Sequence, residues 1–337
     1  MMILVVLCAA VIIFTVMYFV PGDPVEVMLG PEATVEDIEH QRDLLGLNDP
    51  FMVQLGNFLY KAFLKFDMGV SWIRGTSVMS GLVERLPRTF LLGILMVGVM
   101  VIVGVPLGVN AAIHRGGVVD RVLMSVSMLF ISVPEFWLAL MLILVFSLKL
   151  DLLPSMGIET WTCYILPVIA GSLAGVCNVA RQTRASVLEV VNADYITTAR
   201  SKGMKEQSVI YKHMLPNALI PIITLVGNYL TRCVGGTIVI EKIFSFPGIG
   251  LYLTDAISSR DLPIIRGCVI MLAAFTAILM FFVDLAYGFV DPRIKAQYAD
   301  SGKKKGRVGK HRGHHGGRGR HHGHHGDKAL KEGSDKA

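Results

Sequence analysis

The stretch "DYITTARSKGMKEQSVIYKHMLPN" (residues 194–217) differs in character from the rest of its chain. It is polar and dotted with charges, whereas the 337-residue chain is 53% hydrophobic and has a mean hydropathy of +0.57. Such an apolar composition is typical of an integral membrane protein. The stretch therefore predicts a segment that leaves the bilayer between two membrane spans, and its purpose is the main clue to function.

Apolar runs on both sides of this stretch predict an all-α fold with six transmembrane helices. Crossing a bilayer takes about 20 helical residues. Three prolines fall inside these runs, which membrane helices tolerate when they pack against neighbours or line a cavity. We expect a packed bundle around a path. The predicted spans are Met1–Val20, Phe90–Ile113, Val122–Leu148, Thr162–Ala180, Asn217–Ile240 and Ile264–Gly288.

The placement of Lys and Arg predicts the orientation. With the N-terminus in the cytoplasm, 21 of the 32 Lys and Arg residues lie in cytoplasmic segments, and the opposite topology would place those 21 outside. Basic residues favour the cytoplasmic side of a membrane protein. We therefore expect both termini in the cytoplasm, together with residues 181–216.

Four parts follow from this pattern. Residues 1–20 are the first span, and residues 21–89 form an acidic extracytoplasmic segment with a short helix after Thr34. Residues 90–290 are a five-helix core that contains the loop 184–216. Residues 291–337 are a basic cytoplasmic tail, which is expected to be disordered because it lacks apolar periodicity.

The outer segment between the last two spans, "EKIFSFPGIGLYLTDAISSRDLP" (residues 241–263), combines aromatic residues with Pro-Gly and Gly. This composition suits a compact turn or a re-entrant scoop on the outer face. An ordinary ordered loop explains it equally well, so both interpretations stay open.

Within the polar stretch, residues 184–200 have near-helical apolar spacing and predict one helix. Gly203 suits a left-handed turn, and residues 204–214 predict a second helix that Pro216 limits at the membrane surface. The helical periodicity with a placed glycine argues against a solvated loop, whereas a DNA-binding helix-turn-helix and a docking element for a cytoplasmic protein both fit this pattern. The docking element fits best, because membrane spans tether the segment at both ends.

At this point a resemblance becomes specific. Eleven residues separate Gly203 from Leu215-Pro216, which is the spacing of the cytoplasmic "EAA" loop of ABC-importer permeases. Residues 3–295 resemble the dipeptide/oligopeptide/nickel permease family, with a type I importer fold. The matching stretches are "VPGDPV" (20–25), "SVPEFWLALMLILVFSLKLDLLPSMG" (132–157), "ADYITTARSKG" (193–203), "LPNALIPIIT" (215–224), "IEKIFSFPGIG" (240–250) and "VDLAYGFVDPRI" (283–294).

The resemblance implies that the loop is a coupling helix seated in a groove of a partner ATPase. Closure of the ATPase pair would then rock the spans between inward-facing and outward-facing states. Thr197, Thr198 and His213 depart from the broad consensus of that loop. The implied coupling residues are Asp194, Thr198, Ala199, Arg200, Lys202, Gly203, Lys205, Leu215 and Pro216.

The resemblance also implies the partners: a homologous second permease, two ABC ATPases, an extracytoplasmic binding protein and the lipid bilayer of a bacterial or archaeal plasma membrane. No G-x-x-x-x-G-K-[ST] motif occurs, so we expect no enzyme activity and no bound cofactor here, with ATP and Mg²⁺ held by the partner subunits. No nucleic-acid role is expected.

An ion-gradient-driven secondary transporter is the alternative function. A membrane-bound enzyme is disfavoured because the spans hold no cluster of catalytic residue types.

The cargo is less well defined. Glu135 and Arg232 lie in predicted spans, where charged residues tend to pair or to line a path. They form either a structural ion pair or, with Asn228, part of the translocation path.

Histidines in the tail could hold Ni²⁺ or Zn²⁺ inside the cell. The alternative is a basic tail that contacts anionic lipid. Peptide is slightly favoured over nickel as substrate. The tail histidines are His311, His314, His315, His321, His322, His324 and His325.

Overall fold

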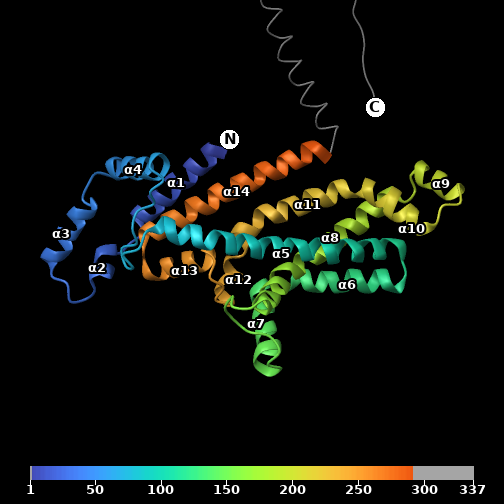
Figure 1. Ribbon diagram of the computed structural model, residues 1–337, viewed down its shortest axis with the longest axis horizontal. Helices are drawn as coiled ribbons and strands as arrows, with labels where there is room; N and C mark the ends of the chain where they lie inside the picture. Colours follow the sequence, from blue (N-terminus) through green and yellow to red (C-terminus); the bar gives the residue numbers. More distant parts are fainter. Residues whose placement is uncertain (1, 291–337) are drawn as a thin grey trace, which may run out of the picture. The chain divides into compact units, whose positions relative to one another are not determined.

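The computed structural model describes residues 2–290, and within them secondary structure is helical apart from one isolated bridge between Val70 and Ser77. Long helices lie alongside one another; several shorter ones lie at their two ends, and α7 (Glu135–Leu142) projects from near the middle (Figure 1). The predicted all-α membrane fold is confirmed. The tail from residue 291 lies outside the described residues.

Among the described residues, five helices are long and apolar enough to cross a membrane. They are α1 (Met2–Phe19), α5 (Val78–Ile113), α8 (Ile165–Val190, preceded by a 3-10 turn at Trp161–Tyr164), α11 (Leu215–Gly236) and α14 (Leu262–Val290). α5 begins well before the predicted Phe90, because Pro87 lies inside the helix without ending it.

The predicted third span, Val122–Leu148, is not one straight helix. It consists of α6 (Val118–Ser132) and α7 (Glu135–Leu142) with a π-helical extension (Ile143–Lys149), and the two parts are bent by 98°. Pro134 is the N-cap of α7 and Val133 is extended, as expected for a residue before proline. The count of six spans therefore holds only if this bent pair is taken as one span.

Close packing of α5 against α8 builds the centre of the bundle (Figure 1). Each helix presents glycines to the other. A Cβ at Gly104 of α5 would lie 2.8 Å from the Val176 carbonyl oxygen of α8, and a Cβ at Gly175 of α8 would overlap the Met100 side chain of α5. Small residues at such contacts let membrane helices approach closely, which increases van der Waals contact where lipid supplies no hydrophobic drive.

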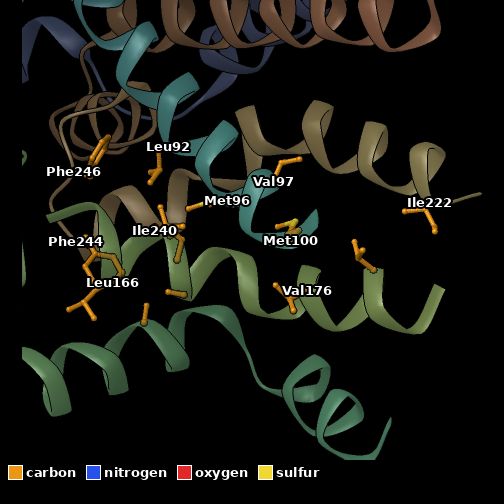
Figure 2. Close-up of a cluster of buried hydrophobic side chains, with 14 residues drawn as sticks. Leu92, Met96, Val97, Met100, Leu166, Val176, Ile222, Ile240, Phe244 and Phe246 are labelled. Atoms are coloured by element: carbon orange, nitrogen blue, oxygen red, sulfur yellow. The ribbon is translucent and has the colours of Figure 1, made fainter. Parts of the chain in front are cut away.

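The largest buried apolar cluster fills this interface and extends to α11 and to α12 (Ile238–Ile243). Figure 2 shows its side chains converging from several helices. Phe244 and Phe246 follow α12 and are almost fully buried, so the outer turn after α12 is fastened to the core. The labelled members are Leu92, Met96, Val97, Met100, Leu166, Val176, Ile222, Ile240, Phe244 and Phe246.

The segment 21–77 forms short helices at one end of the bundle: α2 (Pro24–Leu29), α3 (Val35–Leu45) and α4 (Phe51–Leu59), extended by a π-helical turn (Tyr60–Leu64). The predicted start and stop of α3 are confirmed. Thr34 and Asp37 form a capping box, and Gly46 ends the helix with a φ of 67°. In Figure 1, α2 and α3 lie at the opposite end of the long helices from α9 (Asp194–Ser201) and α10 (Glu206–Ser208).

Candidate functional site

The candidate site is the 194–217 loop, and its first helix is shorter than predicted. α8 ends at Val190, and α9 starts at Asp194 after an extended Ala193, so the single helix expected over 184–200 is wrong. β-branched Val190 and Val191 weaken a helix, and Asn192 competes for backbone hydrogen bonds. The break redirects α9 away from the axis of α8 (Figure 1).

The second part of the loop also differs from the prediction. A π-helical segment (Val209–Met214) follows α10 and runs directly into α11, so Pro216 does not end a helix. Pro216 lies in the first turn of α11. A proline has no backbone N–H to donate to the preceding turn, but the π-helical turns before α11 have already shifted that hydrogen-bond pattern, so the proline costs little there. The loop is therefore continuous with the spanning helix that follows it.

An apolar face fastens the loop to the end of the bundle. Ile196 and Ala199 of α9 are buried, with 0% and 6% of their surface exposed. They pack in one cluster with Val109 and Ala112 of α5 and with Val187 of α8; Val209, Ile210, Met214 and Ala218 complete the cluster. Ala199, predicted as a partner contact, thus supports the loop from within and does not present its side chain to a partner.

The opposite face of the loop is exposed. Asp194, Thr198, Lys202, Gly203 and Lys205 all lie on this face, and Pro216 at the start of α11 is exposed too, while Leu215 is half-buried. Gly203 adopts a φ of 73° with nothing within 4 Å of a Cβ placed there. The predicted left-handed turn is therefore confirmed. The space outside the Gly203 turn is open.

Arg200 has a partner within the loop, although sequence reasoning assigned it to a partner protein. Its Nη2 lies 2.6 Å from Glu206 Oε1 and its Nε 3.2 Å from Oε2, so a two-pronged ion pair spans the Gly203 turn. The hydrogen bonds to Glu206 raise the pKa of the Arg200 guanidinium. This pair holds α9 and α10 together, and Lys202 and Lys205 are the exposed lysines nearest to the Gly203 turn.

A second ion pair, which sequence reasoning missed, fixes the helix that leads into the loop. Arg184 of α8 donates from Nε to Asp120 Oδ1 at 2.5 Å and from Nη2 to Oδ2 at 2.7 Å, while Gly116 N donates to Oδ2 at 2.9 Å. Asp120 is buried in the first turn of α6. Because 64 residues separate the partners, only the fold reveals the pair.

The three predicted path residues lie on two elements, α7 and α11. No ion pair among the described residues joins Glu135 to Arg232, so the structural pair is absent. Asn228 and Arg232, four residues apart on α11, are both exposed and share a face. Glu135 begins α7 with its carboxylate beside α8, where a Cβ at Gly171 would lie 3.3 Å from Oε1.

The outer segment 241–263 is a compact helical unit built around a buried carboxylate. Glu241 of α12 accepts hydrogen bonds from Thr89 Oγ1 at 2.8 Å, Thr237 Oγ1 at 3.1 Å and Leu251 N at 3.1 Å. Burial raises the pKa of its carboxyl group, while these hydrogen bonds act in the opposite direction. The carboxylate thus caps the start of α13 (Ile249–Ser259).

This arrangement explains the "PGIG" sequence. A Cβ at Gly248 would overlap the Glu241 carboxylate, and one at Gly250 would lie 2.7 Å from Ile238 Cα. Thr89 Oγ1 also accepts from Ile249 N at 2.9 Å, so α5, α12 and α13 meet at one buried polar point. The glycines permit a backbone approach that any side chain would prevent.

Residues 2–290 hold no group of three or more His, Cys, Asp and Glu side chains placed to bind a metal ion. The seven predicted histidines of the tail lie outside the described residues.

Comparison with known proteins identifies the class. Residues 104–296 match the family model of the binding-protein-dependent transport system inner membrane component, and residues 1–93 match that of the N-terminal part of such membrane components. The chain belongs to this family of ABC-importer permeases, which are multi-pass proteins of the inner membrane. The predicted family and location are thereby confirmed.

Individual relatives agree with this assignment. A protein of Brucella abortus (strain 2308) named "Putative peptide transport system permease protein" is 38% identical over 86% of this chain and 95% of its own length. The glutathione transport system permease protein GsiC of Escherichia coli (strain K12) is 36% identical over 85% of this chain and 93% of its own. An inward-facing structure of the MetNI methionine ABC transporter superposes with a TM-score of 0.54 at 18% identity, over 63% of this chain and 97% of that one, which shows a shared fold.

Proposed function

We propose that this chain is the transmembrane subunit of an importer for di- or oligopeptides, and that the 194–217 loop couples it to an ATPase. The relatives named for peptide and glutathione transport support this substrate class over nickel. Half of the translocation path would come from this chain, and the other half from a homologous permease. An extracytoplasmic binding protein delivers the cargo, and two ATPase subunits bind ATP and Mg²⁺.

The two-faced structure of the loop carries the coupling proposal. Its inner face is fixed to α5 and α8 through Ile196, Ala199 and Met214, and the Asp120–Arg184 pair fixes α8 in turn to α6. Its outer face exposes the Gly203 turn between Lys202 and Lys205. A force applied to the exposed turn therefore passes into three helices as a rigid-body movement, which is how packed interfaces transmit domain motion.

Gly203→Asp tests the coupling role. Because the space around Gly203 is open and aspartate is among the residues that tolerate a left-handed backbone, the variant should fold and insert at a cost of about 1 kcal/mol. A carboxylate at the turn, between two exposed lysines, should obstruct a partner that approaches the backbone. We expect ATP-dependent peptide uptake and co-purification of the ATPase to fall at least about tenfold, the effect of losing about 1.4 kcal/mol of binding.

Gly75→Asp is the matched control. Gly75 lies in the segment 21–77 with a φ of 66° and nothing within 4 Å of a Cβ, so its backbone cost is the same. This variant should transport and bind the ATPase like the wild type. Normal uptake and ATPase association in Gly203→Asp would refute the coupling role. Uptake that persists without any ATPase would instead indicate an ion-gradient-driven transporter.

A further inference from the structure

An arginine-rich cavity lies at the outer end of the bundle, away from the coupling loop. Its volume is about 570 Å³, within the usual range for small-ligand sites. The end of α1, the segment from Val20 to Gln54, the C-terminus of α13 and the first turn of α14 line it. Arg42, Arg260 and Arg266 contribute to the lining, against a single carboxylate, Asp23.

The one carboxylate is fully used by other groups. Asp23 Oδ2 accepts from Arg42 Nε at 2.8 Å and lies 2.7 Å from Arg42 Nη2, while Oδ1 accepts from Val25 N at 2.9 Å to cap α2. Among the described residues, Arg260 and Arg266 take part in no ion pair. The cavity therefore has two positive charges without an internal counter-charge.

Arg266 is held where a guanidinium group is costly without a ligand. Its central carbon lies 4.4 Å from the ring centroid of Phe14 and 5.5 Å from that of Phe58, so aromatic faces support it from one side. Its Nε is buried and has no hydrogen-bond acceptor. A buried donor left unpaired is destabilising, so the Arg266 guanidinium group is incompletely paired within the described residues, and the same residue lines the cavity.

Arg260 occupies an unusual backbone position. It ends α13 with a φ of 55°, in the left-handed region where glycine is the common residue at a helix C-terminus. The next residue, Asp261, is buried and accepts from Ser71 Oγ at 2.5 Å, which fixes the turn. The Arg260 guanidinium in turn fills the space beside Gly22. Arg260 thus brings a guanidinium group to the cavity from a backbone conformation that glycine adopts more readily.

The position of the cavity indicates the ligand. Met17 and Tyr18 end the first span, and Leu262 begins the last one, so the cavity lies at the level where these spans leave the bilayer. Guanidinium groups bind phosphate through paired hydrogen bonds. We propose that this cavity binds a phosphate group, supplied by an anionic phospholipid headgroup or by free phosphate.

The test is a titration of the full-length chain in detergent, with bound ligand counted by native mass spectrometry. The probes are short-chain phosphatidylglycerol, diacylglycerol with the same acyl chains, and inorganic phosphate. Arg260→Gln should fold, because the side chain is exposed, and should weaken phosphatidylglycerol binding about tenfold, as expected for loss of a charge-assisted hydrogen bond. Arg266→Gln should weaken it at least as much. Arg115→Gln, an exposed arginine beyond the far end of α5, should leave binding unchanged.

The other probes identify the source of the phosphate. Binding of phosphatidylglycerol that millimolar inorganic phosphate does not displace supports a lipid headgroup, whereas displacement supports free phosphate. Equal affinity for diacylglycerol would show that acyl chains, not phosphate, hold the ligand. That result, or unchanged binding in Arg260→Gln, would overturn the proposal. Because Arg260 is exposed and its variant is expected to fold, the conclusion does not depend on whether Arg266→Gln is stable.

Discussion

At the scale of single residues, Glu241 shows how one buried carboxylate organises three helices. It is fully buried, and its hydrogen bonds come from α5, from Thr237 before α12 and from the first turn of α13. A buried acceptor with several donors is costly to remove, because each donor is left unsatisfied. The residue therefore stabilises the outer segment 241–263 more than any surface charge nearby.

Glu241→Gln tests this role with little change of shape. The amide replaces one acceptor oxygen with a donor, which would face another donor such as Leu251 N–H. We expect a loss of about 1–3 kcal/mol in the free energy of unfolding, measured as a lower Tm of the purified protein. Lys242→Ala removes the neighbouring exposed ion pair with Asp255 and should cost at most about 1 kcal/mol. If the Tm of Glu241→Gln were no lower than that of Lys242→Ala, the proposed stabilising role of Glu241 would be contradicted.

At the scale of elements, the position of the 194–217 loop depends on how α9 packs against the bundle. Ile196 is its most deeply buried side chain, whereas the next residue, Thr197, is exposed. This alternation means that α9 has one face for the bundle and another for solvent. Its attachment to the bundle is therefore an apolar contact that can be weakened without touching the outer surface.

Ile196→Ala should loosen the loop at a cost of about 2–5 kcal/mol, the usual range for truncating a buried isoleucine. Local opening exposes the backbone at Arg200, Lys202 and Lys205, so the rate of tryptic cleavage in the loop should rise more than tenfold. Peptide uptake should fall although the protein still inserts. Thr197→Ala changes the neighbouring exposed residue and should alter the free energy of unfolding by no more than about 0.5 kcal/mol. Its tryptic cleavage rate should therefore stay close to that of the wild type. Equal cleavage rates in the two variants would show that this contact does not hold the loop.

At the scale of the whole molecule, the tail beyond residue 290 lies outside the residues that the structure describes. A role for its seven histidines in binding Ni²⁺ or Zn²⁺ stays a prediction. Replacing all seven with serine keeps the Lys and Arg residues, so it separates metal binding from attraction to anionic lipid. We expect lower nickel and zinc retention in cells, measured by elemental analysis, with unchanged membrane localisation. Deleting residues 301–337 should lower retention equally, and unchanged metal content in both variants would exclude the metal role.

Much of the fold was predictable because local patterns specify it. Apolar runs identified the spans, and Thr34 with Gly46 marked both ends of α3. Gly203 identified the turn of the 194–217 loop, since few other residues adopt its backbone conformation readily. Helix ends were less predictable: Pro134 bent a predicted span and Pro216 did not end a helix, because neighbouring turns decide what a proline does.

The sequence by itself therefore determined the spans through its apolar runs and the position of the 194–217 loop through its polarity, and the quoted motifs indicated the class of protein by resemblance. Only the tertiary structure decided which residues act together. The pairing of Asp120 with Arg184, the buried position of Ala199 and the meeting of Arg42, Arg260 and Arg266 at one cavity join residues far apart in the chain. Charge and burial depend on three-dimensional neighbours, and spacing along a chain does not specify them.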